Sequence, residues 1–124
     1  MININKTLRS FKFALSGILY LFKHENNARV HLLAAVVATG LGFWFKISST
    51  EWCFVVLAIG LVSAAEAFNS ALEKLCDMVE PEQHPQIKII KDVAAGAVLL
   101  TALAAAIIGF IVFENKFLDF FNNF

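Results

Sequence analysis

Charged residues are scarce in this chain of 124 residues: Asp, Glu, Lys and Arg together make up 16%, against about 25% in a typical soluble domain. Ten basic residues balance ten acidic ones, so no net charge favours binding to nucleic acid. Hydrophobic residues make up 59% of the chain, and thirteen of them are Phe. This composition excludes an ordinary soluble domain. It predicts an all-α integral membrane protein whose single domain covers residues 1–124.

Several familiar motifs are also missing. Cys53 and Cys76 lack the short spacing of a redox or metal motif, and we expect both to be free, buried and apolar in behaviour. The six glycines are dispersed, so no glycine-rich phosphate loop exists, and the histidines show no zinc spacing. Charges interrupt the first 29 residues, which argues against a cleavable signal. These absences exclude P-loop enzymes, zinc enzymes and nucleic-acid-binding proteins of known motif.

Three long apolar runs are present instead. They predict transmembrane helices over about residues 28–47, 52–77 and 90–113, since each is long enough to cross a hydrocarbon core of about 30 Å. Basic residues are distributed unevenly around them. Only Lys46 and Lys116 fall on the side opposite the amino terminus. The other eight are Lys6, Arg9, Lys12, Lys23, Arg29, Lys74, Lys88 and Lys91. This asymmetry places the amino terminus and the second loop in the cytoplasm.

Residues 5–23 form a further predicted element. Apolar side chains recur there at helical spacing, while Lys12, Ser16 and Lys23 fall on the remaining face. This pattern predicts an amphipathic helix lying in the headgroup layer. Such a helix is either a membrane anchor alone or one wall of an interfacial site that receives a lipid. In the second case Ser16 and Arg29 are candidate lipid contacts.

A polar stripe interrupts the second apolar run. Glu66, Asn69, Glu73 and Asp77 are separated by three, four and four positions, so on a helix they share one face. An ionisable side chain at the depth of Glu66 costs about 2.5–3.5 kcal/mol and usually faces a cavity or a partner. Two alternatives stay open: the outer acids are simply solvated, or the stripe is a structural polar seam between helices.

Glu25, just before the first run, is expected at the same depth as Glu73. Two carboxylates of this kind suit Mg²⁺ that is bound mainly by phosphate oxygens, and the deeper Glu66 suits a general base acting on an alcohol. The residues alone therefore indicate metal-assisted phosphate chemistry at the cytoplasmic interface. The rival interpretation is a non-enzymatic scaffold or channel subunit. A channel would need polar residues through the whole span, yet residues 93–111 offer only Thr101.

The segment "EAFNSALEKLCDMVEPEQHPQIKIIKDVAAGAVLL" closely resembles the small bacterial membrane diacylglycerol kinase family, which includes undecaprenol kinases. "FALSGI" and the pattern Glu25-x-Asn27-x-Arg29-Val30-His31 extend the resemblance over residues 6–113. It implies a homotrimeric lipid kinase of the bacterial inner membrane. Such an enzyme transfers the γ-phosphoryl group of ATP to a lipid alcohol with the help of Mg²⁺.

The resemblance also implies roles for single residues. Glu66 matches the catalytic base, and Glu25 and Glu73 match the Mg²⁺ ligands. The residues implied in nucleotide binding are Glu25, Asn69, Glu73, Asp77, Glu82, His84, Lys91 and Asp92. A basic residue expected near the start of the surface helix is either Lys6 or Arg9. The acceptor is diacylglycerol or undecaprenol, and "EQHP" with the Arg-x-His pattern favours the polyprenol.

Overall fold

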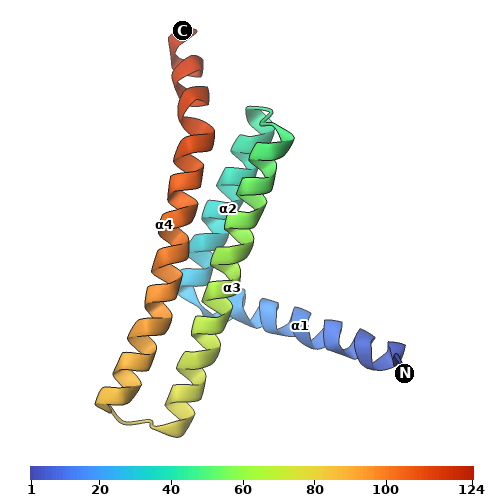
Figure 1. Ribbon diagram of the computed structural model, residues 1–124, viewed down its shortest axis with the longest axis vertical. Helices are drawn as coiled ribbons and strands as arrows, with labels where there is room; N and C mark the ends of the chain where they lie inside the picture. The colour runs from blue at the N-terminus through green and yellow to red at the C-terminus, as the bar shows by residue number, and fades with distance from the viewer.

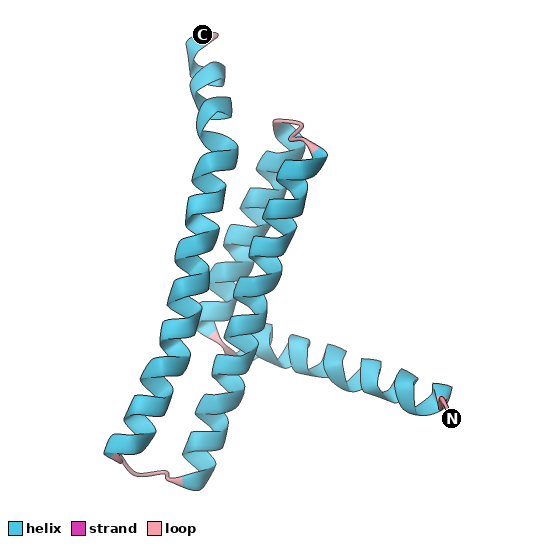
Figure 2. Cartoon of the chain, in the orientation of Figure 1, coloured by secondary structure: helices cyan, strands magenta, loops and turns pink.

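The computed structural model covers all 124 residues and contains helices and loops but no strand (Figure 2). Its elements are α1 (Ile4–His24), α2 (Asn26–Trp44), α3 (Ser49–Val79) and α4 (Pro85–Asn122). The predicted all-α class is therefore confirmed. α3 packs against each of the other three helices, and most extensively against α4.

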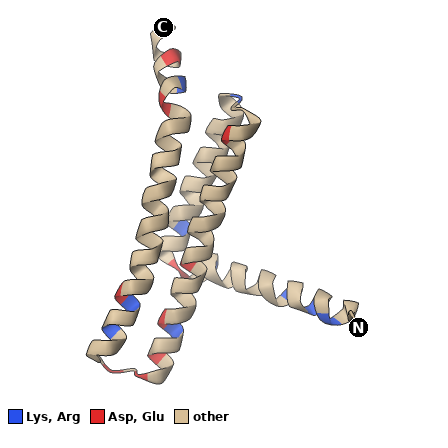
Figure 3. Ribbon diagram, viewed as in Figure 1, with Lys and Arg blue, Asp and Glu red and all other residues tan.

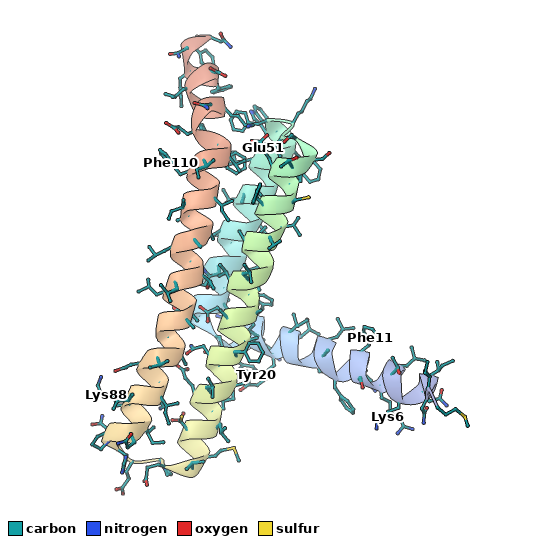
Figure 4. The ribbon with its side chains drawn as sticks, viewed as in Figure 1. Lys6, Phe11, Tyr20, Glu51, Lys88 and Phe110 are labelled. Atoms are coloured by element: carbon teal, nitrogen blue, oxygen red, sulfur yellow. The ribbon has the colours of Figure 1, made fainter.

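α1 stands apart from the rest of the molecule and points away from the bundle formed by α2, α3 and α4 (Figure 1). Its helix begins where the side chain of Asn3 accepts a hydrogen bond from the backbone N–H of Lys6 at 3.1 Å. It ends at Glu25, whose backbone is extended. Lys6 and Phe11 leave the helix on different sides (Figure 4), as an amphipathic helix requires.

A tight connection joins α2 to α3. α2 ends at Trp44, and Lys46 then adopts a positive φ of 52° before the chain enters α3. Ser48 and Glu51 form a capping box at the start of α3, in which each side chain accepts from the backbone N–H of the other. The two helices consequently run side by side in opposite directions (Figure 1).

The second connection, between α3 and α4, uses proline as a start signal. Pro85 occupies the first turn of α4, where a missing N–H costs nothing, and the His84 side chain accepts from the backbone N–H of Gln86 at 3.1 Å. α4 then continues without a break through the carboxy-terminal "ENKFLDFFN" to Asn122. Near that end, Lys116 donates to Glu51 of α3 at 2.6 Å.

Few side chains are buried within one chain: only 15 of 124 residues. α3 and α4 are long and apolar enough to cross a membrane, whereas α2 falls short of that test. Its first turn contains Asn26, Asn27 and Arg29, which lower its hydropathy. Two spans thus have structural support, and the third stays a prediction.

The cysteine prediction is partly wrong. Both thiols are free, as expected, but only Cys76 is buried, whereas Cys53 is exposed. Cys53 lies on a face of α3 that neither α2 nor α4 covers, because α3 turns its Val55, Ala58 and Val62 face toward the bundle.

Candidate functional site

Glu66 is the most deeply enclosed large side chain of the protein, with 2% of its surface exposed. Asn69 and Ser70, one turn further along α3, are buried as well. Glu73 is half-buried and Asp77 is exposed. The polar stripe therefore starts in the packed part of the molecule and emerges at the end of α3 that leads into α4.

Two atoms of this stripe stand out chemically. Oε1 of Glu66 and Oδ1 of Asn69 are fully buried, yet neither accepts a well-aligned hydrogen bond from the chain. A buried acceptor without a donor costs about 1–3 kcal/mol, so natural proteins keep few of them. Such a pair is expected where a substrate, an ion or a proton supplies the missing interaction.

His31 of α2 is an ionisable neighbour in direct contact with Glu66. Its Nε2 lies 3.2 Å from Glu66 Oε1, close enough for an ion pair if the ring is protonated. The ring N–H is not aligned well enough to count as a hydrogen bond, which is why Oε1 still lacks one. His31 was part of the sequence pattern but received no role there, because the contact depends on how α2 and α3 are placed side by side.

Glu25 and Glu73 approach Glu66 from two directions. Glu25 lies at the corner between α1 and α2, where its side chain makes no capping hydrogen bond. Glu73 lies on α3, two turns beyond Glu66. Both are near enough for their charges to act electrostatically on Glu66. Figure 3 shows acidic residues gathered at the corner where α1, α2 and α3 meet. The chain thus brings the three predicted glutamates to one corner.

The outer part of the stripe is joined to α4. Lys91 of α4 donates to Asp77 of α3 at 2.6 Å, and Lys91 also acts electrostatically on Glu73. Asp92 pairs with Lys88 one turn earlier at 2.5 Å. The Lys91–Asp77 contact joins the ends of α3 and α4, whereas the Lys88–Asp92 pair lies within α4. Figure 3 shows mixed charges at this turn.

Glu82 and His84 lie in the loop between α3 and α4. With Lys88, Lys91 and Asp92 they line an open hollow of about 540 Å³. The predicted nucleotide residues therefore fall into two groups, one at the Glu66 corner and one around this hollow. Lys91 connects them, since it borders the hollow and contacts Asp77.

Three predicted residues of α1 lie away from this corner. Lys6 and Arg9 precede Glu25 by nineteen and sixteen positions, which corresponds to about 28 and 24 Å along a helix. Ser16 is exposed in the middle of α1. Within one chain, the structure does not bring these side chains to Glu66.

Arg29, a candidate lipid contact, makes contacts within the chain that the sequence did not indicate. Its guanidinium folds back onto the carboxy-terminal end of α1, with Nε donating to the carbonyl of Phe22 at 2.9 Å and a terminal nitrogen donating to the carbonyl of Lys23. A cation at this position complements the negative end of the helix dipole. Arg29 therefore fixes the angle between α1 and α2, a contact that no sequence pattern indicated.

Known proteins similar to this chain are lipid kinases. Residues 12–113 match the family model described as prokaryotic diacylglycerol kinase. The undecaprenol kinase of Bacillus subtilis strain 168 is 36% identical over 113 residues, which cover 91% of this chain and 92% of that protein. A diacylglycerol kinase of Synechocystis is 37% identical over 82% of this chain and 59% of the relative. The diacylglycerol kinase of Escherichia coli K12 is 22% identical over 90% of this chain and 92% of the relative.

The family model covers most of the chain, including all of α2 and α3, most of α4 and all the residues of the Glu66 corner. The interpretation as a non-enzymatic scaffold or channel subunit is thereby set aside. The single polar side chain in the apolar part of α4, Thr101, is also satisfied within its own helix, where it donates to the carbonyl of Val98 at 2.8 Å. The chain belongs to the prokaryotic diacylglycerol kinase family and is a membrane lipid kinase.

Proposed function

We propose that this protein transfers the γ-phosphoryl group of ATP to the hydroxyl of a membrane lipid alcohol, and that Glu66 is the general base. The observation that carries the proposal is the state of Glu66: a carboxylate with 2% exposure whose Oε1 lacks an aligned hydrogen bond. A buried carboxylate with so few donors keeps an oxygen free to accept a proton. A group of this kind within reach of a lipid hydroxyl contributes about 10²–10⁴-fold to the rate.

The step itself balances simply. The lipid hydroxyl gives its proton to Glu66 as its oxygen attacks the γ-phosphorus, and ADP leaves from the opposite side. Asn69, one turn along α3, has a buried carbonyl oxygen without a donor, so it is placed to orient the hydroxyl or a water beside Glu66. Most of the rate enhancement then comes from positioning the two substrates.

Glu25 and Glu73 are proposed to hold Mg²⁺. Both side chains are half-buried carboxylates that make no hydrogen bond or ion pair in the chain, so their oxygens are free to bind a cation. The charges of both also act electrostatically on Glu66. One chain offers no group of three or more ligating side chains, so the proposal assigns the remaining ligand positions to phosphate oxygens and water. When bound, Mg²⁺ would supply neutralisation of the phosphate charge.

The nucleotide is proposed to lie between the Glu66 corner and the hollow beside the α3–α4 loop. Lys91 borders the hollow, contacts Asp77 at the outer end of the polar stripe and is a suitable partner for phosphate. Glu82, His84 and Asp92 border the same hollow and are proposed to contact the rest of the nucleotide.

The acceptor is proposed to be undecaprenol. The supporting observation is the 36% identity to an undecaprenol kinase over 92% of that protein, whereas the Escherichia coli K12 diacylglycerol kinase, matched over the same share, is 22% identical. Diacylglycerol is the second candidate, supported by the family description itself. Ser16 of α1 is proposed to contact the lipid from the headgroup layer.

We further propose a single-domain protein of the bacterial inner membrane with three spans, with the site on the cytoplasmic face and three chains in the active assembly. The low burial within one chain supports assembly or lipid contact, because most large apolar side chains of the bundle face outward. The distance of Lys6 and Arg9 from Glu25 along α1 is compatible with their acting on a neighbouring chain's site.

The experiment uses purified full-length protein in lipid vesicles, ATP labelled on the γ-phosphate, and either undecaprenol or diacylglycerol. We expect label in the extracted lipid phase, with faster labelling of undecaprenol. Faster labelling of diacylglycerol would overturn the acceptor assignment but leave the kinase assignment in place. No label in either lipid, or in a panel of shorter polyprenols, would overturn the proposed reaction.

A further inference from the structure

The contact between His31 and Glu66 joins two helices at the centre of the proposed site. His31 lies on α2, and its Nε2 is 3.2 Å from Oε1 of Glu66 on α3. The imidazole keeps 26% of its side-chain surface accessible, while Glu66 keeps 2%. His31 is therefore the more accessible member of the pair and covers the buried one.

The two oxygens of Glu66 differ in their surroundings. Only Oε1 is both fully buried and without an aligned hydrogen bond, and this is the oxygen that faces His31. A small rotation of the imidazole would direct its N–H along the 3.2 Å line, within the usual range for such a bond. Oε2 is then the oxygen that remains for the proton of an incoming hydroxyl.

The contact between His31 and Glu66 lies beside a mostly apolar cavity. His31 borders a cavity of about 320 Å³ between α2, α3 and α4, and twelve of its fifteen lining residues are hydrophobic. Ala35, Ala58 and Val62 are among them. Apart from His31, Ser63 is the only lining residue with a side-chain hydrogen-bond donor, and it does not donate to Oε1 of Glu66. Without His31, the side chain of Glu66 is therefore free to rotate or to draw in water.

We propose that His31 is a positioning residue for phosphoryl transfer: its Nε2–H donates to Oε1 of Glu66 and so holds Oε2 toward the lipid hydroxyl. The inference rests on the proposed role of Glu66 as general base and adds a partner to it. The neutral tautomer with the proton on Nε2 is sufficient, so the contact requires no charge on the ring. A base held in this way keeps the short approach that proton transfer needs.

Two substitutions separate this role from simple packing. His31→Gln places an amide nitrogen near the position of Nε2 and keeps a donor, whereas His31→Leu keeps an apolar body and removes it. Since a misplacement of about 1 Å can cost about 10²-fold in rate, we expect His31→Leu to lower kcat by roughly that factor. We expect His31→Gln to retain kcat within about tenfold of the unchanged protein, with the KM for ATP within about twofold in both variants.

Thr39→Val is the matched control on the same helix. Thr39 is half-buried and donates only to the carbonyl of Ala35 within α2, at 2.8 Å, so its loss removes a polar group without affecting Glu66. Steady-state rates are measured in vesicles while ATP and the lipid alcohol are varied in turn. Helix content by circular dichroism and elution from a sizing column check that each variant is folded.

Wild-type kcat in folded His31→Leu would overturn the inference, and so would a His31→Gln protein no faster than His31→Leu. If His31→Leu does not fold, His31→Asn replaces it, because the shorter amide cannot reach the Nε2 position. Equal kcat for the Gln and Asn variants would then overturn the inference. Both comparisons are made against a wild-type protein that transfers phosphate to lipid. If the wild-type protein shows no phosphoryl transfer, the proposed function is overturned and the inference falls with it.

Discussion

Replacing Gly42 with alanine is expected to destabilise the packing of α2 against α3. A Cβ added at Gly42 would lie 2.6 Å from Cη2 and 2.9 Å from Cζ2 of Trp52, and 3.1 Å from Cδ1 of Ile47. Carbon atoms that are not bonded pack at about 3.5–4.0 Å, so the indole ring must move by about 1 Å. Movement of the indole also disturbs its contact with the Phe43 ring, whose centroid lies 4.9 Å away.

Overpacking of this kind costs about 1–3 kcal/mol. Gly40→Ala is the matched control, because nothing lies within 4 Å of a Cβ at Gly40, and alanine is favoured over glycine in a helix by up to about 1 kcal/mol. The assay is unfolding of the detergent-solubilised protein in a denaturant titration, followed by circular dichroism. Gly42→Ala as stable as Gly40→Ala would refute the packing argument and the placement of Trp52.

Two further substitutions test the corner around Glu66. Arg29→Lys removes the two hydrogen bonds that the guanidinium donates to the carbonyls of Phe22 and Lys23. We therefore expect α1 to become more susceptible to limited proteolysis. An unchanged cleavage rate would contradict the stabilising role of Arg29 at the end of α1. Glu73→Ala removes a proposed Mg²⁺ ligand, so the Mg²⁺ concentration for half-maximal activity should rise about tenfold or more, whereas an unchanged titration would contradict the ligand role.

Much of this arrangement could be predicted from local sequence. Helical spacing placed Glu66 and Asn69 on one face of α3, and the structure finds both buried on that face. The amphipathic pattern over residues 5–23 corresponds to α1. These predictions succeed because the period of a helix relates neighbouring residues without reference to the rest of the fold.

Other features depend on how the helices are arranged. The contact between His31 and Glu66 needs the register of α2 against α3, and the fold-back of Arg29 needs the angle between α1 and α2. Neither the register nor the angle can be predicted from the spacing of residues along a single helix. Cys53 was expected to be buried because of its chemistry, but its exposure depends on which faces of α3 the other helices cover. Long-range geometry of this kind is set by packing, not by propensity.

Glu66 is proposed to take the proton from the lipid hydroxyl. The most direct test compares the unchanged protein with Glu66→Gln in lipid vesicles, measuring both nucleotide binding and transfer of the labelled γ-phosphate to lipid. Glutamine keeps the shape of the side chain but does not act as a base, so we expect nearly normal ATP binding and a kcat lowered by about 10²-fold or more. A kcat within a fewfold of the unchanged protein would contradict the account.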